Sequence, residues 1–203
     1  ALVINEALDR NKGIATQYAN LGILYKTRGD LEAAEKHYRT ALTIYEEFGD
    51  KEGMATQYGN LGILNEARGD LNVAEKYIRE ALALNEEIGR KEGIANQFGE
   101  LGNLSKKLSD PSAAEEFYRK SLALNEEIGR KEGVAIQYSN IGVLYYERGD
   151  LGAAEEYYRK ALAIDWTCPA LVERHSLRYS NPGLECDRRF VAERGMSSAG
   201  IVE

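Results

Sequence analysis

Proline, cysteine and long apolar runs are scarce in this sequence of 203 residues, which contains 3 Pro and 2 Cys. Two cysteines cannot build a disulfide-stabilised scaffold, so we expect a reducing, cytoplasmic environment. No apolar stretch approaches the roughly 18 residues of a transmembrane helix, so no membrane partner is expected. The first 12 residues already contain charged side chains and do not resemble a signal peptide.

Basic residues are in deficit as well, because 26 Lys and Arg stand against 33 Asp and Glu, with a net charge of -7. Nucleic acid is bound through clustered lysines and arginines, so this balance argues against nucleic acid as a partner. The motifs of phosphate loops, dinucleotide folds and zinc proteases are missing. The cluster formed by Cys168, His175 and Cys186 has spacings that fit no zinc site. We therefore expect neither an enzyme nor a cofactor.

Glycine, by contrast, is abundant and recurs every 40 residues. Residues 13–52 and 53–92 are identical at about 25 of 40 positions, which chance does not produce. A period of about 20 to 50 residues indicates stacked supersecondary units. The glycines that mark the period include Gly13, Gly53, Gly93 and Gly133, and also Gly22, Gly62, Gly102 and Gly142.

The period divides the chain into a short fragment, four repeats and an aperiodic tail. The fragment has the phase of the end of a repeat, because its first residues match those that begin at Ala81. We interpret it as the second helix of a truncated preceding repeat, in a protein that extends further toward its N-terminus. The alternative is a natural start with a lone capping helix. The divisions are 1–12 for the fragment, 13–52, 53–92, 93–132 and 133–165 for the repeats, and 166–203 for the tail.

Each repeat contains two helical patterns separated by a turn signal. Gly29 is suited to end the first helix, and Asp30 to cap the second. A glycine inside a helix, such as Gly22, costs about 1 kcal/mol relative to alanine, so we expect it to permit close approach of the second helix at Ala34. The residues that carry the two patterns are Ile14, Tyr18, Leu21 and Tyr25, then Leu31, Ala34, Tyr38, Ala41, Leu42, Tyr45 and Phe48.

These residues resemble the tetratricopeptide repeat pattern, and the match returns in all four repeats over about three quarters of the chain. The 40-residue length and the Gly-Asp-Lys-Glu-Gly link at 49–53 are similar to kinesin light chains, Pins-type adaptors and bacterial signalling proteins. The resemblance implies an all-α fold, a right-handed α-solenoid of stacked antiparallel helix hairpins. It also implies that the first helices line a concave groove for peptides or partner helices.

The resemblance places candidate binding residues on the first helix of each repeat. An asparagine that recurs at one position is, in related adaptors, the residue that holds the ligand main chain; bridging between neighbouring helices is the alternative. The recurring glutamines, such as Gln57, are instead expected to form an internal hydrogen-bond ladder toward the neighbouring hairpin. The predicted peptide-binding residues are Asn20, Asn60, Asn140, Thr16, Ile23, Thr27, Ile63, Glu66, Asn103, Lys106, Val143 and Tyr146.

The third repeat and the tail depart from the pattern. At 108–111 the third repeat reads Leu-Ser-Asp-Pro in place of Arg-Gly-Asp-Leu, so its turn should be strained or reshaped. Glu100 and Asn103 should also make its concave face more polar. The tail begins abruptly at Trp166 and is electrically neutral. It is consistent with a helical cap, with an internal ligand folded into the groove, or with non-native sequence.

The sequence therefore predicts a protein-interaction scaffold that binds a peptide or helix of a partner protein. Because the whole net charge lies on the repeats, a neutral or basic ligand is favoured. The alternative is a structural module that forms a homo-oligomer through the ends of the solenoid or by exchange of hairpins.

Overall fold

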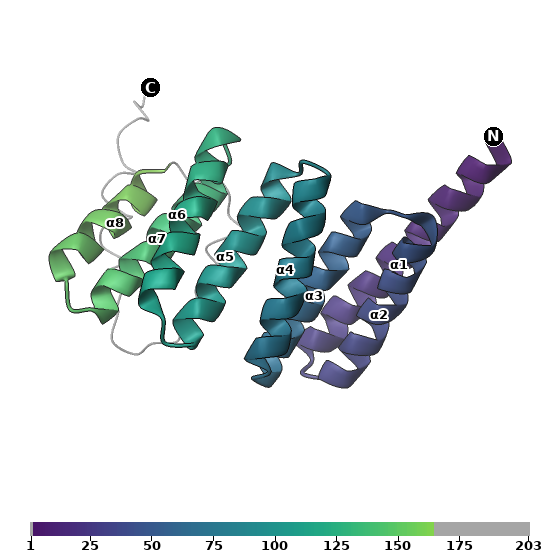
Figure 1. The fold of residues 1–203 in the computed structure, drawn as a ribbon, viewed down its shortest axis with the longest axis horizontal. Coiled ribbons are helices and arrows are strands. Elements are labelled where there is room, and N and C mark those ends of the chain that lie inside the picture. The colour runs from purple at the N-terminus through teal and green to yellow at the C-terminus, as the bar shows by residue number, and fades with distance from the viewer. Residues whose placement is uncertain (1, 165–203) are drawn as a thin grey trace, which may run out of the picture. The chain divides into compact units, whose positions relative to one another are not determined.

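The computed structural model describes residues 2–164, with side chains from residue 11 onward. The chain divides into two units, Ala1–Asp165 and Trp166–Glu203, and the described residues belong to the first. Interpretations of the tail, and of its His and Cys residues, lie outside the described residues. Between residues 2 and 164 the regular elements are helices that follow one another side by side (Figure 1). They are α1 (Leu2–Thr27), α2 (Leu31–Phe48), α3 (Lys51–Arg68), α4 (Leu71–Glu87), α5 (Lys91–Lys107), α6 (Pro111–Glu127), α7 (Lys131–Glu147) and α8 (Leu151–Ala163).

The helices form four hairpins, and each hairpin packs on the next through α2 and α3, α4 and α5, and α6 and α7. Successive hairpins in contact along one direction make an α-solenoid, as predicted. Such a stack has a hydrophobic core between every pair of neighbouring helices instead of one central core. A surface along the stack can therefore combine side chains from all four repeats.

The turns between helices use the residues that the sequence indicated. Gly49 ends α2 in the left-handed conformation, with φ of 66°. The Asp50 side chain then caps α3 by accepting a hydrogen bond of 3.0 Å from the Gly53 amide. In the third repeat Ser109 adopts φ of 61° in place of a glycine, and Pro111 opens α6. The turn keeps its shape, and a serine takes a backbone conformation that side chains disfavour.

The first helix contradicts the expected division at 12/13. α1 runs without interruption from Leu2 to Thr27, so residues 2–12 do not form a separate second helix. The later links turn at a left-handed glycine, for example Gly89 with φ of 67°. One repeat earlier that position is Asp9, for which the left-handed conformation is costly. The helical backbone therefore continues through the link.

The core between the first two hairpins illustrates what one repeat contributes to the next. Leu61 and Leu64 on α3 are fully buried, and they pack with Tyr38 and Leu42 on α2. In α1 the residues at the same repeat positions, Leu21 and Leu24, are 38% and 43% exposed. A leucine at one of these repeat positions is thus a core residue on α3 and a surface residue on α1.

The mid-helix glycines do permit close approach, but a large side chain of the second helix takes most of the space, a tyrosine ring at Gly22, Gly102 and Gly142 and Ile78 at Gly62. A Cβ atom on Gly102 would lie 2.5 Å from ring carbons of Tyr118 on α6. At Gly142 the corresponding ring is that of Tyr158, at 2.8 Å. The expectation that an alanine occupies this contact is therefore wrong for these repeats, because the larger ring one turn further along the second helix reaches the glycine first.

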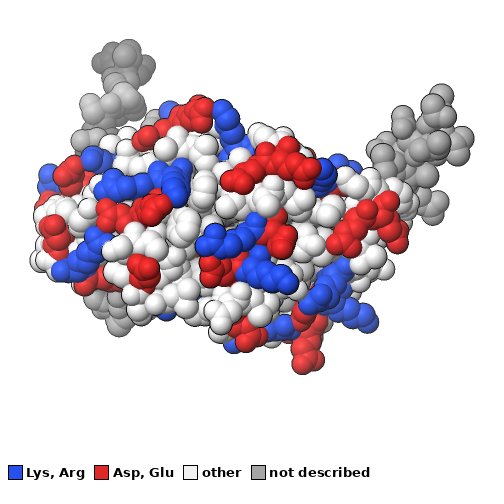
Figure 2. All heavy atoms as spheres, in the orientation of Figure 1, with Lys and Arg blue, Asp and Glu red and all other residues white. Residues whose placement is uncertain are grey.

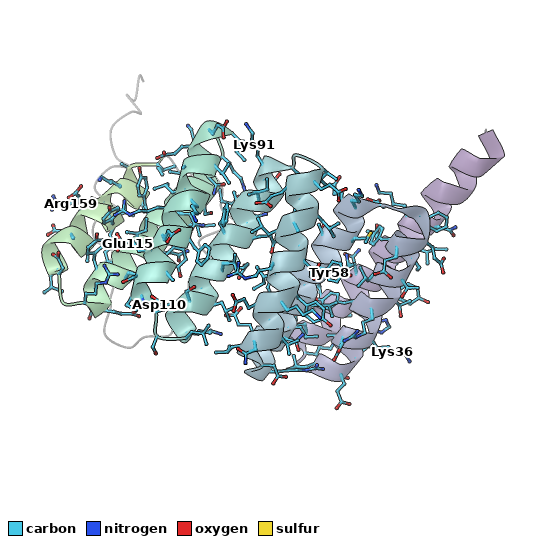
Figure 3. All side chains as sticks on the ribbon, in the orientation of Figure 1. Lys36, Tyr58, Lys91, Asp110, Glu115 and Arg159 are labelled. Atoms are coloured by element: carbon cyan, nitrogen blue, oxygen red, sulfur yellow. The ribbon has the colours of Figure 1, made fainter. Side chains whose placement is uncertain are left out.

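The aromatic residue near the start of each first helix also packs within the hairpin, as expected. Tyr58, labelled in Figure 3, stacks on Tyr77 with ring centroids 6.0 Å apart. Phe98 and Phe117 form the equivalent pair in the third repeat, at 6.2 Å. Stacked aromatic rings at this distance add packing energy beyond simple burial. These positions hold the two helices of a hairpin together.

A carboxylate on the second helix links the first two repeats. Glu35 on α2 accepts a hydrogen bond of 2.8 Å from Arg39 on the same helix. It also accepts from Arg68 at the end of α3, and that guanidinium donates to the Leu31 carbonyl at 3.0 Å. Arg39 in turn reaches Tyr77 on α4 at 3.1 Å. One carboxylate thus connects three helices.

The third and fourth repeats are linked in the same way through Glu115, which is labelled on α6 in Figure 3. It accepts hydrogen bonds of 2.7 Å from Arg119 and from Arg148. At the junction between the second and third repeats the second arginine is replaced by Leu108. Figure 2 shows acidic and basic side chains interspersed on this face, without a continuous area of one sign.

These hydrogen bonds change the acidity of both carboxyl groups. Donation from Arg68 is the main cause that lowers the pKa of Glu35 from its ordinary value of 4.5. For Glu115, burial acts to raise the pKa, but the bonds from Arg119, Arg148 and Tyr145 outweigh it and the pKa is lowered. A carboxylate whose pKa is lower in the folded state stabilises the fold above its unfolded pKa.

We therefore predict that this stabilisation is present above about pH 4.5 and is lost as the pH falls through the lower pKa values of the folded state. The variant Glu35→Gln/Glu115→Gln should melt at lower temperature at pH 7 and respond less to acidification below pH 4.5. Circular dichroism melts between pH 3 and pH 7 measure both effects. Glu155→Gln is the control, because Glu155 pairs with exposed Arg159 on the same helix. Parallel pH profiles for all the proteins would contradict the prediction.

Candidate functional site

The predicted binding residues lie along the first helix of each hairpin. We call the surface formed by these residues on α1, α3, α5 and α7 the first-helix face. Because the residues recur at intervals of three or four, those within one helix share a side of it. The set comprises Thr16, Asn20, Ile23 and Thr27 on α1, Asn60, Ile63 and Glu66 on α3, Asn103 and Lys106 on α5, and Asn140, Val143 and Tyr146 on α7.

Two of the three recurring asparagines bond within their own helix. The Asn140 amide nitrogen donates to the Gln137 side-chain oxygen at 3.2 Å, and Asn60 makes the equivalent, longer contact with Gln57 at 3.4 Å. Both asparagines are half-buried, and Asn20 is exposed. An asparagine amide has two N–H donors and one acceptor, so this bond uses only part of its capacity. The bond orients the amide on the surface and does not bridge neighbouring helices.

Three of the four recurring glutamines are internal, as expected, but Gln17 on α1 is exposed. Gln57, Gln97 and Gln137 are 1%, 9% and 6% exposed. A Cβ atom on Gly59 of the preceding repeat would lie 3.2 Å from the Gln97 amide nitrogen, so this side chain faces the neighbouring hairpin. The expected ladder of bonds between repeats is replaced by bonds from the asparagines on the same helices. The buried glutamines thus lie beneath the first-helix face, and Gln57 and Gln137 bond to its asparagines.

Apolar side chains on the face are accessible at its two ends. Ile23 on α1 is 47% exposed, and Tyr146 on α7 is 48% exposed. Ile63 and Val143 lie between them in the sequence and are half-buried. Exposed apolar groups beside oriented amides can bind the side chains and the backbone of an extended peptide at the same time.

The predicted threonines are less available than expected. Thr27 donates its hydroxyl to the Ile23 carbonyl at 2.9 Å. Thr16 donates to the Lys12 carbonyl at 2.8 Å and lies 3.2 Å from the Tyr45 hydroxyl. Their hydroxyl protons therefore satisfy backbone or neighbouring groups.

The charged residues on the face pair across repeats. Glu66 on α3 bonds to Lys107 on α5 at 2.8 Å, and its side chain is only 12% exposed. Lys106 on α5 bonds to Glu147 on α7, also at 2.8 Å. These pairs neutralise each other, so they tie neighbouring first helices together and leave little net charge at their positions.

Sequence reasoning did not include Glu100 among the binding residues, although it occupies the asparagine position of the third repeat. The Asn103 amide nitrogen donates to the Glu100 carboxylate at 3.2 Å, and the Asn103 oxygen accepts from the Tyr118 hydroxyl at 2.9 Å. The substitution of glutamate for asparagine within an otherwise regular series is the signal that could have identified it.

Within residues 11–164, whose side chains are described, no group of three or more His, Cys, Asp or Glu side chains is placed to hold a metal ion. None of the helices between residues 2 and 164 is both long enough and apolar enough to span a bilayer.

Stacked hairpins that present oriented amides and apolar groups along their first helices define an α-solenoid of the protein-interaction class. The chain belongs to the tetratricopeptide repeat family, whose model matches residues 13–87 and 94–165. No curated protein matches the sequence.

Solved structures confirm the fold. BtubC (BKLC) from P. vanneervenii has a TM-score of 0.67 at 22% identity, over 98% of this chain and 77% of that one. Aspartyl phosphate phosphatase F from Bacillus subtilis has a TM-score of 0.71 at 16% identity, over 76% of this chain and 40% of that one. The Rap conjugation gene regulator of plasmid pLS20, in complex with the Phr* peptide, has a TM-score of 0.65 at 15% identity, over 73% and 42%. The chain thus spans less than half of the last two proteins.

Proposed function

We propose that this protein is a non-catalytic adaptor that binds an extended peptide or a helix of a partner protein along the first-helix face. The observation that carries the proposal is the pair of asparagines, Asn60 on α3 and Asn140 on α7, each of which donates to a buried glutamine of its own helix. A row of oriented amides is suited to a peptide main chain, which offers a donor and an acceptor at every residue.

The structural neighbours support a peptide as the ligand. The Rap regulator, whose solved structure contains the Phr* peptide, shares this fold. Ile23 and Tyr146, each close to half exposed, would contact apolar side chains of the peptide. Reversible adaptor binding of this kind has a dissociation constant in the micromolar range, which corresponds to a binding free energy of about -8 kcal/mol.

We further propose that the ligand is neutral or basic. The protein has a net charge of -7, and the lysines on α5 are already bonded to Glu66 and Glu147. An acidic peptide would approach a like-charged protein and find these lysines engaged. A neutral or basic peptide avoids that repulsion.

The asparagines provide the direct test. A peptide is first selected from a randomised displayed library on the full chain, and its affinity is then measured by isothermal titration calorimetry. We expect the variant Asn20→Ala/Asn60→Ala/Asn140→Ala to bind this peptide about 30-fold more weakly, because a hydrogen bond contributes about 1 kcal/mol, Asn60 and Asn140 together contribute about 2 kcal/mol, and the exposed Asn20 contributes less. Asn72→Ala is the matched control, because Asn72 is exposed on the second helix α4. An unchanged affinity in the triple variant would show that the site is wrong.

A further inference from the structure

The two ends of the stack expose apolar side chains at repeat positions that are buried inside it. In the described part of the chain α1 packs on α2 and α8 on α7, and no hairpin lies on the outer side of either helix (Figure 1). On α8, Leu162 is 81% exposed, whereas Leu42 at the same repeat position of α2 is 8% exposed. On α1, Leu21 and Leu24 are exposed, and residues 2–12 continue the helix along its axis without folding back over them. Each end of the described stack thus presents an open apolar helix face.

The two faces are the two halves of a contact that the stack already makes internally. At the first junction between repeats α2 packs on α3, and Leu42 lies with Leu61 in one hydrophobic cluster. Leu162 takes the place of Leu42 three repeats later, and Leu21 takes the place of Leu61 one repeat earlier. The same chain therefore offers the second-helix half of a junction at one end and the first-helix half at the other.

An ion pair crosses two of the internal junctions. Arg68 at the end of α3 bonds to Glu35 on α2, and Arg148, which follows α7, bonds to Glu115 on α6 at 2.7 Å. Each glutamate also pairs with the arginine four residues later on its own helix. A carboxylate at this position thus accepts from two guanidinium groups at once, one from its own helix and one from the next repeat.

The ends of the stack retain both partners of this pair. Arg28, which follows α1, is exposed, and no second helix precedes it in the described chain. Glu155 on α8 pairs with Arg159 of its own helix, and no described repeat follows α8 to supply the other arginine. The second junction has Leu108 at the position of the arginine, so the repeat fold does not require a basic residue there. Opposite charges therefore stand at matching positions of two complementary faces.

We propose that α1 of one copy of this protein packs on α8 of a second copy, so that the copies associate head to tail. Leu162 of the copy that contributes α8 then lies against Leu21 and Leu24 of the other, and Arg28 of that other copy donates to Glu155. The contact repeats the internal junctions, in which the same types of residue are buried together and paired.

Charge selects this arrangement over two copies joined by like ends. Two α1 faces would place two Arg28 side chains in one contact, and two α8 faces would do the same with Glu155, which is unfavourable. Because a head-to-tail contact leaves one face free at each end, association continues into a chain or closes into a ring. Leu21 and Leu24 are not residues of the first-helix face, so this contact and peptide binding are separate properties.

Sedimentation velocity of the full chain at increasing concentration tests the association. We expect the weight-average mass to rise beyond that of a dimer. Leu162→Asp should weaken association at least about tenfold, because it places a carboxylate in an apolar contact, and should leave the fold intact because the side chain is exposed. Val73→Asp is the matched control, since Val73 is an exposed apolar residue on the second helix α4, and it should associate like the natural sequence.

The charged pair tests the direction of the contact. Arg28→Glu and Glu155→Arg each create a contact between like charges and should each weaken association about fivefold, with a smaller effect in high salt. The double variant Arg28→Glu/Glu155→Arg restores opposite charges and should recover most of the affinity, as should an equimolar mixture of the two single variants. If neither recovers it, the head-to-tail pairing is wrong.

A mass that stays monomeric at every concentration would overturn the proposal and point to a segment of residues 166–203 as the occupant of α8. A dimer that does not grow, or an association that Leu162→Asp leaves unchanged, would overturn it as well. Circular dichroism melts at low concentration establish that each variant is folded. None of these results changes the expectation for the asparagine variants, which are measured by their affinity for a peptide.

Discussion

Replacing Leu61 with alanine should lower the free energy of unfolding by about 3 kcal/mol, the typical cost of a large-to-small change in a packed core. Leu61 is fully buried between α2 and α3, against Tyr38 and Leu42. Removal of its side chain leaves a cavity that the neighbouring helices cannot close without giving up their own contacts. Urea unfolding followed by circular dichroism measures the change.

The repeat itself supplies a matched control for this prediction. Leu21 occupies the same position in the first repeat but is 38% exposed, because no hairpin covers that side of α1 in the described structure. Leu21→Ala should therefore cost less than about 1 kcal/mol. Equal losses for the two variants would show that the leucines contribute through their own helices and not through packing between hairpins.

Gly102→Ala should destabilise the protein by about 2 kcal/mol, although alanine is the better helix former. A Cβ atom at this position would lie 2.5 Å from ring carbons of Tyr118, and the ring is buried with little room to move. The steric cost of forcing the helices apart exceeds the gain of about 1 kcal/mol in helix propensity. Chemical unfolding measures the net effect.

Gly13→Ala tests the same substitution without the steric term. Gly13 also lies inside a helix, but no atom of another side chain or helix comes within 4 Å of its Cβ position. This variant should be more stable by about 0.5 to 1 kcal/mol. The two glycines belong to different series within the repeat, but both lie inside a helix, so opposite signs would demonstrate that contact with the second helix decides the outcome. A gain in stability for Gly102→Ala would contradict this account.

The third repeat shows how far the sequence leads toward the polar residues of the first-helix face. The loss of the turn glycine and the polar character of Glu100 and Asn103 were both evident from comparison with the other repeats. The bond from Tyr118 to Asn103 was not, because the tyrosine lies on the other helix of the hairpin and its counterpart Tyr38 has no such partner. The tyrosine at this repeat position only packs in the core in the first repeat, whereas in the third repeat its hydroxyl also orients Asn103.

The sequence by itself determined the elements that depend on local chemistry. Helices, turns and capping residues follow from side-chain periodicity and from the backbone preferences of glycine and aspartate, and these are set within a few residues of the chain. Because the four repeats share this pattern, the helices predicted in one repeat are predicted at the equivalent residues of the others. The same comparison places Asp9 where later links have a glycine such as Gly89, and α1 is continuous through this position.

Only the tertiary structure decided what depends on contacts between residues far apart in the chain. It showed that Leu21 is exposed and Leu61 is buried, and that a tyrosine ring, not an alanine, faces Gly102. It also showed that Glu66 and Lys106 are paired with neighbouring helices. Two residues of identical type and repeat position have the same local preferences. Whether each one is buried in the core or exposed on the surface is therefore decided by the helix that packs against it.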